Sequence, residues 1–299
     1  MNKLILTILL TSTIWSTAQA IDLDQGGDHP NNTAPGNLSI GVNSMRNIRV
    51  GSDFYSDLYP KLYSGVTSGG ENTAVGVEAL REITQGSDNT CVGSRSCRDQ
   101  TNPYYNTALG HYALGFNQLG NKNTAVGAFT MNGVEGVTNS YNNSALGFRA
   151  MAYITDGHDN TAVGLDSGIN ISTGNYNTLL GVGSGLMINE GNSNICIGRG
   201  SGYFIKNGNN NIIIGDQTSW DSKDKNNNTI VGGNTGWSDT YNGIGNNNTI
   251  LGANVKNIKE GTENNIILSI GDGTIKAHYK NGKWHLYGDL VVHGSITKE

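Results

Sequence analysis

The stretch Asn72-Thr73-Ala74-Val75-Gly76 is the clearest copy of a pattern, N-[TSI]-x-[VLI]-G, that recurs through most of this 299-residue chain. Its last residue returns every 17 residues, apart from two steps of 20. The copies end at Gly76, Gly93, Gly110, Gly127, Gly147, Gly164, Gly181, Gly198, Gly215, Gly232, Gly252 and Ser269. A constant period without a helical signature indicates one small unit stacked many times. Positions are counted below from this last residue, which is position 0.

The residue types at each position predict a short strand that ends in a turn. Position −4 is Asn in all twelve copies, and position −1 is always Val, Leu or Ile. Amides stacked at successive coils can hydrogen-bond along the stack, so the Asn residues are expected to form a ladder. The structural positions of the repeat are exemplified by Asn72, Gly76, Asn123, Gly127, Asn160 and Gly164.

A second Gly at position −7 of eight copies indicates a second corner in each coil. We therefore expect a flattened coil of two short strands, which makes the fold an all-β β-roll or β-solenoid. At the usual spacing between strands of ~4.8 Å, the eleven steps give a rod on the order of 50 Å long.

The composition agrees with a turn-dense β repeat. The chain contains 43 Gly and 41 Asn, only 14% charged residues and 4 Pro. An ordinary helical domain or a coiled coil tolerates Gly badly, and collagen requires Gly at every third residue together with abundant Pro. Composition alone leaves a disordered chain open, but the regular placement of the aliphatic residues favours the repeat.

At two positions of the coil, side-chain size changes in opposite directions along the chain, which indicates that both positions face one core. Position −2 is small from Ala74 to Ala162 and, except for Cys196, large from Leu179 onward. Position +4 does the reverse: it is Leu, Cys or Met up to Met151 and Gly or Ser from Gly168 to Gly236. Opposite changes of this kind conserve core volume. Ala162 and Gly168 are small together, so we expect a neighbouring coil to fill their space.

The strand also carries aliphatic residues on its other face, at position −1. The inside of one thin coil can cover only one face, so this row is either exposed along the rod or covered by another chain. A parallel homotrimer closed around the row is the economical solution and is the expected assembly.

The ends of the chain differ from the repeat. Residues 1–20 are predicted to be a signal peptide, with Lys3, an apolar run and the small-residue pattern Ala18-Gln19-Ala20; an N-terminal membrane anchor is the alternative. Residues 21–68 hold outlying copies at 37–41 and 47–51, and residues 69–269 form the repeat array. Residues 270–299 alternate apolar and polar residues around Asn281-Gly282, which predicts a small β-hairpin module.

The copies Gly69 to Gly76 and Gly120 to Gly127 resemble the head repeats of trimeric autotransporter adhesins and the related fibre repeats of phage tail proteins. The resemblance covers roughly residues 37–269. It implies a left-handed β-roll, a trimeric fibre and a role in attachment, and it assigns no individual binding residue. The C-terminal segment is similar to the β-rich stretch that follows such repeats in phage fibres and in fibre-like surface proteins of predatory bacteria.

No catalytic or metal-binding motif stands out, so we expect neither an enzyme nor a cofactor. The three cysteines contain no C-x-x-C pair. Cys91 and Cys97 occupy the two positions expected to face each other in one coil; they are either a disulfide or two free buried thiols. Cys196 is expected to be a lone thiol in the core.

Exposed aromatic residues are the candidates for partner binding, because Trp and Tyr stack on sugars and anchor protein interfaces. Those singled out are Tyr104, Tyr105, Trp220, Trp237 and Tyr241; Trp237 and Tyr241 lie where a long step inserts three residues. The other insertion lies around Val134 to Tyr141. An aromatic group within residues 52–66 is interpreted either as a cap on the open end or as a binding element.

The expected function is therefore a non-catalytic fibrous adhesin, secreted or displayed on a bacterial surface, that binds a glycan or a protein receptor. The alternatives are a structural spacer whose binding parts lie in other chains and a phage-derived tail-fibre fragment. The net charge of −5 does not suggest a basic surface that would bind nucleic acid, and no segment after residue 20 predicts a membrane-spanning helix.

Overall fold

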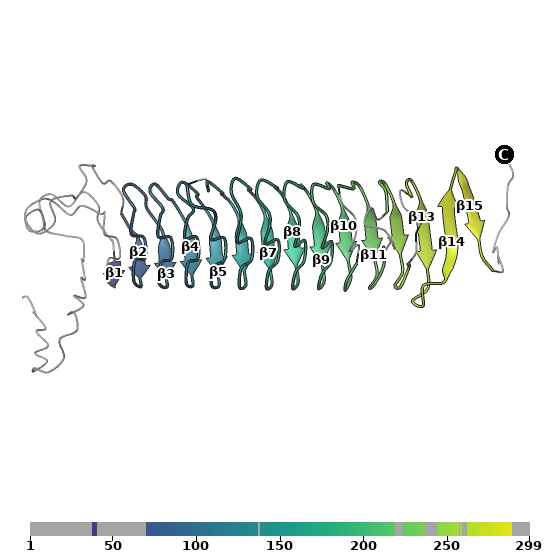
Figure 1. The fold of residues 1–299 in the computed structure, drawn as a ribbon, viewed down its shortest axis with the longest axis horizontal. Coiled ribbons are helices and arrows are strands. Elements are labelled where there is room, and N and C mark those ends of the chain that lie inside the picture. The colour runs from purple at the N-terminus through teal and green to yellow at the C-terminus, as the bar shows by residue number, and fades with distance from the viewer. Residues whose placement is uncertain are drawn as a thin grey trace, which may run out of the picture.

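A computed structural model describes residues 38–40 (backbone only), 70–136, 138–218, 224–236, 244–256, 258 and 262–288. This part of the chain is a rod of stacked coils, and its strands follow one another along the rod in chain order (Figure 1). All fifteen strands belong to one sheet, and the described residues contain no helix. The prediction of an all-β solenoid with 17-residue coils is confirmed.

Each coil contributes one short strand, at positions −3 to −1. The strands are β1 (Leu38–Ile40), β2 (Thr73–Val75), β3 (Thr90–Val92), β4 (Thr107–Leu109), β5 (Thr124–Val126), β6 (Ser144–Leu146), β7 (Thr161–Val163), β8 (Thr178–Leu180), β9 (Ile195–Ile197), β10 (Ile212–Ile214), β11 (Thr229–Val231), β12 (Thr249–Leu251), β13 (Ile266–Ser269), β14 (Ile275–Lys280) and β15 (Lys283–Leu286). From β1 to β13 neighbours are parallel and in register, so like positions of successive copies lie side by side.

The second strand expected in each coil is absent from the described residues. Positions +2 and +4 take left-handed backbone angles, as in Glu78 (φ 56°) and Leu80 (φ 48°), and a β-strand cannot contain such residues. Coil-to-coil hydrogen bonds persist nevertheless, since the backbone N–H of Leu80 donates to the Ser96 carbonyl at 3.0 Å. The return limb is therefore a column of turns rather than a sheet.

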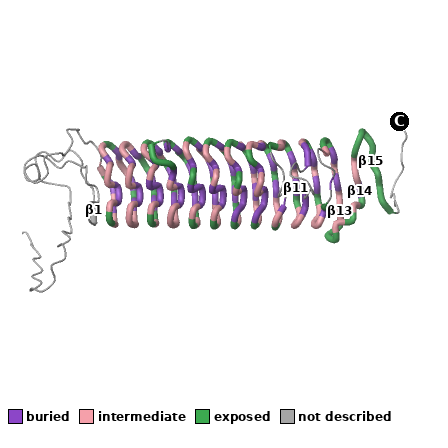
Figure 2. The backbone as a smooth tube through the Cα atoms, in the orientation of Figure 1, coloured by how far each residue is buried: buried purple, intermediate pink, exposed green. Residues whose placement is uncertain are grey.

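Side chains at positions −2 and +4 share the core, as the exchange of volume predicted. The position −2 and +4 residues of the first coils, such as Ala74 and Leu80, are fully buried in one cluster. Buried residues recur in coil after coil along the rod (Figure 2). A Cβ on Gly168 would lie 2.6 Å from Leu179 Cδ1, so the next coil does fill the space beside this glycine. A row missed from the sequence, position +7, adds Ile154 and its equivalents in later coils to the same core.

The next coil along the rod leaves no room for a side chain at position 0, so glycine is required there. Gly164 has φ +133°, and a Cβ there would lie 2.5 Å from the carbonyl oxygen of Gly181 in the next coil. The same contact recurs at each such glycine up to Gly252, whose Cβ would meet the carbonyl oxygen of Ser269. No thirteenth copy follows Ser269 in the repeat, which explains why this copy alone ends in serine.

The parallel stack ends where the chain reverses direction. β14 pairs antiparallel with β13, and β15 pairs antiparallel with β14. Asn281 and Gly282 connect β14 to β15, and both have positive φ, as a tight two-residue turn requires. After β13 the sheet therefore continues with two antiparallel strands instead of a further parallel coil.

Cys91 and Cys97 form a disulfide across the core of one coil, with a Cα–Cα distance of 6.1 Å. Of the two alternatives from the sequence, the structure contains the bond. Cys196 is free and buried, as expected. Its burial raises the pKa of the thiol to about 12, so it is an inert core residue rather than a nucleophile.

Candidate binding edge

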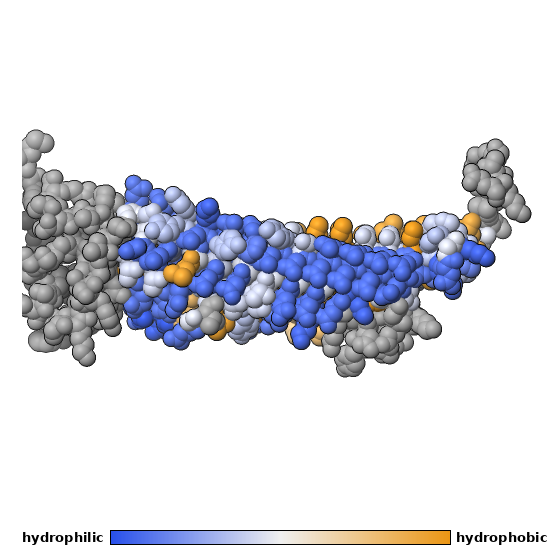
Figure 3. All heavy atoms as spheres, turned by 90° about the horizontal axis from the view of Figure 1, so that it is seen from above, coloured by the Kyte–Doolittle hydropathy of each residue, from blue (hydrophilic) through white to orange (hydrophobic). Residues whose placement is uncertain are grey.

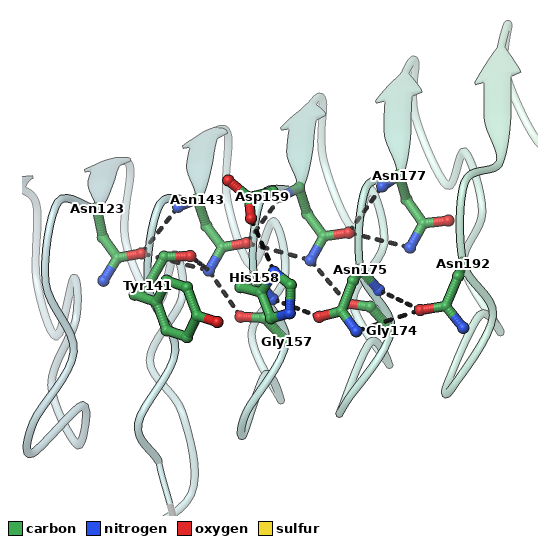
Figure 4. Close-up of polar contacts among 11 residues, drawn as sticks. Asn123, Tyr141, Asn143, Gly157, His158, Asp159, Gly174, Asn175, Asn177 and Asn192 are labelled. Atoms are coloured by element: carbon green, nitrogen blue, oxygen red, sulfur yellow. Dashed lines mark hydrogen bonds and ion pairs between the residues drawn. The ribbon is translucent and has the colours of Figure 1, made fainter.

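The Asn ladder at position −4 is buried, and its side chains hydrogen-bond from coil to coil (Figure 4). Asn160 Nδ2 donates to Asn143 Oδ1 at 3.1 Å and to the Gly174 carbonyl at 2.8 Å. Asn160 Oδ1 accepts the backbone N–H of Asn177 at 2.9 Å and its side-chain N–H at 3.0 Å. This ladder closes the coils onto one another and has no group to offer a ligand.

The corner edge is a second row of side chains, outside this ladder, at positions −6 and −5 from Ser87–Asp88 to Glu263–Asn264. Position −5 has a left-handed backbone throughout, which turns the chain just before each strand. Position −6 is linked from coil to coil in many places, as where the His158 backbone N–H donates to Asn175 Oδ1 at 2.8 Å. The backbone therefore fixes the corner edge as a straight, evenly spaced row.

Tyrosines gather on the corner edge in its N-terminal half. Tyr105 and Tyr176 are each 59% exposed, and Tyr104 and Tyr141 are exposed in the same row. Tyr141 stacks on His158 with ring centroids 4.8 Å apart and 9° between the planes, and Tyr176 meets the same ring edge-on. Rings held in this way present apolar faces to solvent at little cost in side-chain entropy, as a sugar or protein contact needs.

The structure brings some of the predicted site residues together. Tyr104 and Tyr105 lie on the corner edge, and so does Tyr141 from the first insertion. Trp220, Trp237 and Tyr241 lie outside the described residues. Sequence reasoning missed His158 and Tyr176, although counting positions −6 and −5 in each copy places them in the same row as Tyr104 and Tyr105.

His158 also carries the polar chemistry of the corner edge. Its Nδ1 lies 2.8 Å from Asp159 Oδ2, and its backbone N–H donates to Asn175 Oδ1 (Figure 4). The ring is held between Tyr141 and Tyr176. The carboxylate of Asp159 and the surrounding amides can accept and donate hydrogen bonds to hydroxyl groups. No set of three His, Cys, Asp or Glu side chains in the described ranges is arranged to hold a metal ion.

A second aromatic cluster, on the return limb, is held together by its own members. Arg95 and Arg98 each lie 5.3 Å from the ring centroid of Tyr112, and both donate to its hydroxyl. Tyr112 stacks on Phe129 at 5.8 Å. Arg95 hydrogen-bonds to Glu78 at 2.9 Å and so holds the pKa of that carboxyl below its usual value. Because these groups satisfy one another, the cluster ties neighbouring coils together.

A shallow hollow of about 220 Å³ lies further along the return limb. Gly183 and Gly200 stand at position +2, where other coils carry side chains, and Leu165, Val182 and Leu186 line the hollow beside them. A Cβ on Gly183 would meet only Leu186 Cδ1, at 3.6 Å, so packing does not demand glycine there. The hollow is small and open, and its charged lining residues Asp166 and Arg199 are paired with Arg149 and Asp216, so it is a weak candidate for a ligand site.

Comparison of the chain with protein-family models, curated proteins and solved structures gave no match. The described residues also contain no helix with the length and apolarity that a membrane span requires. The function is therefore inferred from the geometry of the rod and of its corner edge.

Proposed function

We propose that this chain is an exported, non-catalytic adhesin that forms a left-handed, trimeric β-roll fibre and attaches to a cell surface or glycan. The observation that carries the proposal is the row of exposed tyrosines on the corner edge of a rigid rod. The resemblance to adhesin heads and tail fibres supports the same function. The signal peptide predicted for residues 1–20, which lie outside the described residues, supports export.

The exposed aliphatic stripe supports the trimer. It consists of the position −1 side chains from Val75 to Leu268, and it includes Leu109 at 50% and Leu146 at 51% exposure. Monomeric proteins seldom leave a continuous apolar surface of this length in water. Parallel copies in register would place equal positions together, and threefold closure covers every stripe without leaving an open surface for further chains.

Three corner edges on one fibre would make attachment multivalent. A single tyrosine edge offers only a few stacking contacts, each worth on the order of 1 kcal/mol. Once one edge is bound, the others are held near the same surface at a high effective concentration, which raises the overall affinity without new contacts. Weak individual contacts are therefore sufficient for firm attachment.

The test is binding of fluorescently labelled mature protein, residues 21–299, to a panel of bacterial and animal cells and to a glycan array. In the test variant Tyr105→Asn and Tyr176→Asn are combined, because Asn accepts the left-handed backbone at position −5. Tyr153→Asn, which replaces a tyrosine of similar exposure on the return limb, is the control. We expect binding by the wild type, a loss of about tenfold or more in the double variant, and no change in the control.

Two results would contradict the proposed function. Absence of binding to every cell and glycan would favour the structural spacer. Equal binding by the wild type and the double variant would remove the corner edge from the attachment surface. Circular dichroism of each variant checks that the fold is retained.

A further inference from the structure

In the C-terminal half of the rod, most residues at the two positions of the corner edge are asparagine. Position −6 is Asn175, Asn192, Asn209, Asn226 and Asn246 in five successive coils. Position −5 is Asn in the last four copies, beginning at Asn210. Between Asn175 and Asn247 these two positions carry no charged residue. A large part of the surface seen from above in this half of the rod is hydrophilic (Figure 3).

The inner row of amides, at position −6, is oriented by the backbone. The backbone N–H of Asn192 donates to Asn209 Oδ1 at 2.9 Å, and that of Asn209 donates to Asn226 Oδ1 at 2.8 Å. The backbone N–H of Asn226 donates to Asn246 Oδ1 at 2.8 Å. The side-chain N–H groups of Asn192 and Asn209 are also used, since each amide donates to the next amide oxygen and to a carbonyl of its own coil. The inner row is thus fixed before any ligand arrives, and it supports the outer row.

The outer row, at position −5, is linked amide to amide and faces water. Asn227 Nδ2 donates to Asn247 Oδ1 at 3.0 Å, and Asn247 Nδ2 donates to Asn264 Oδ1 at 3.1 Å. An Asn amide has two N–H groups and two acceptor sites, so one of each remains for solvent after these bonds. All three side chains are exposed. Successive coils repeat this donor and acceptor pair at a spacing of ~4.8 Å.

We propose that these two rows, the amide comb, bind an uncharged polysaccharide chain that lies along the rod, with the exposed outer row making the contacts and the inner row holding it in place. A donor beside an acceptor matches neighbouring hydroxyls of a sugar, and repetition at even spacing matches a polymer rather than a single sugar. Apart from Glu263 in the last rung, which accepts a hydrogen bond from Asn246 at 2.8 Å, the comb carries no charge that would select an acidic or basic polymer. Its amides are already ordered, so binding costs little conformational entropy. Tyr176, at the N-terminal end of the comb, adds a stacking face.

The proposal rests on the proposed function of attachment and names the ligand class for the C-terminal half of the corner edge. Each rung contributes a weak exchange of water for sugar hydroxyls, so affinity depends on how many coils one chain spans. A glucose monomer engages one rung and should compete poorly. A long glucan engages several rungs and should bind well.

The experiment measures the mobility of the full mature chain in native gels that contain hydroxyethyl cellulose, dextran or alginate. The test variant combines Asn227→Gly and Asn247→Gly, and glycine accepts the left-handed backbone of both positions. The control combines Asn234→Gly and Asn254→Gly. These two residues lie at position +2 of the same two coils and also have positive φ. Each variant loses two amides, but only the test variant loses them from the comb.

At least one of the two neutral glucans should retard the wild type and the control equally, and the test variant should lose at least about fivefold in apparent affinity. Free glucose at the same mass concentration should not compete. Failure of both neutral glucans to retard the wild type, retardation by alginate as strong as by the glucans, or an equal loss in the control would overturn the proposal. If the glucans fail to bind but binding to cells still depends on Tyr105 and Tyr176, the proposal of a polysaccharide ligand is wrong and the proposed attachment function stands.

Discussion

Replacement of Gly164 by Ala is expected to lower the free energy of unfolding by about 3–5 kcal/mol, through a disfavoured backbone angle and a clash with the neighbouring coil. Gly164 has φ +133°, a region that residues with a Cβ rarely adopt. The new Cβ would lie 2.5 Å from the Gly181 carbonyl oxygen, well inside van der Waals contact. The neighbouring backbone cannot yield without disturbing β8, so the two coils separate.

The matched control for this prediction is Gly183→Ala. Gly183 has φ +61°, and its Cβ would lie 3.6 Å from the nearest side chain. Other coils carry Tyr112 or Asn234 at the same position with the same sign of φ. A loss of about 1–2 kcal/mol is expected, since the cost is that of the backbone angle alone. Urea unfolding followed by circular dichroism measures both variants, and similar midpoints for the two would contradict the stacking role of position 0.

Replacement of Asn160 by Ala should be the second most damaging change, with a loss of about 3–5 kcal/mol in the free energy of unfolding. The side chain makes four hydrogen bonds in a site that is 1% exposed. Its removal leaves the Gly174 carbonyl and the Asn177 backbone N–H buried without partners. Each orphaned group costs about 1–3 kcal/mol, and a cavity adds to the loss.

An exposed asparagine provides the comparison for Asn160. Asn210→Gly removes an amide from the outside of the rod at a left-handed position, and we expect a change within about 0.5 kcal/mol. Limited proteolysis should show new cleavage near residue 160 in the first variant and none in the second. Equal stability of the two variants would mean that the buried ladder contributes no more than surface amides do.

The sequence predicts the strand, the ladder and the core of each coil because they follow from residue types at fixed positions. Asn at position −4, an aliphatic residue at −1 and the exchange of volume between −2 and +4 are all visible in the printed chain. The return limb is different. Its left-handed angles fall on residues such as Glu78, Arg95 and Tyr112, which have no strong preference for that conformation. Coil-to-coil stacking imposes these angles, so residue preference could not reveal them.

The corner edge could be predicted only in part for a related reason. Tyr104 and Tyr105 stand out as neighbours in the sequence, whereas Tyr141, His158 and Tyr176 are isolated in three different copies. They meet because the parallel register places position −6 of one coil beside that of the next, as the bridge between Tyr141 and His158 shows. Aligning the copies by position, rather than searching for clusters in sequence, is the signal that finds them.

The most direct test of the proposed fibre is the mass of the mature chain in solution, measured by sedimentation equilibrium. The exposed stripe predicts three times the mass of one chain, and the combined variant Leu109→Glu with Leu146→Glu should dissociate toward single chains because like charges would meet in the covered stripe. A wild type that sediments as a folded monomer would contradict the trimer and leave the stripe open to solvent.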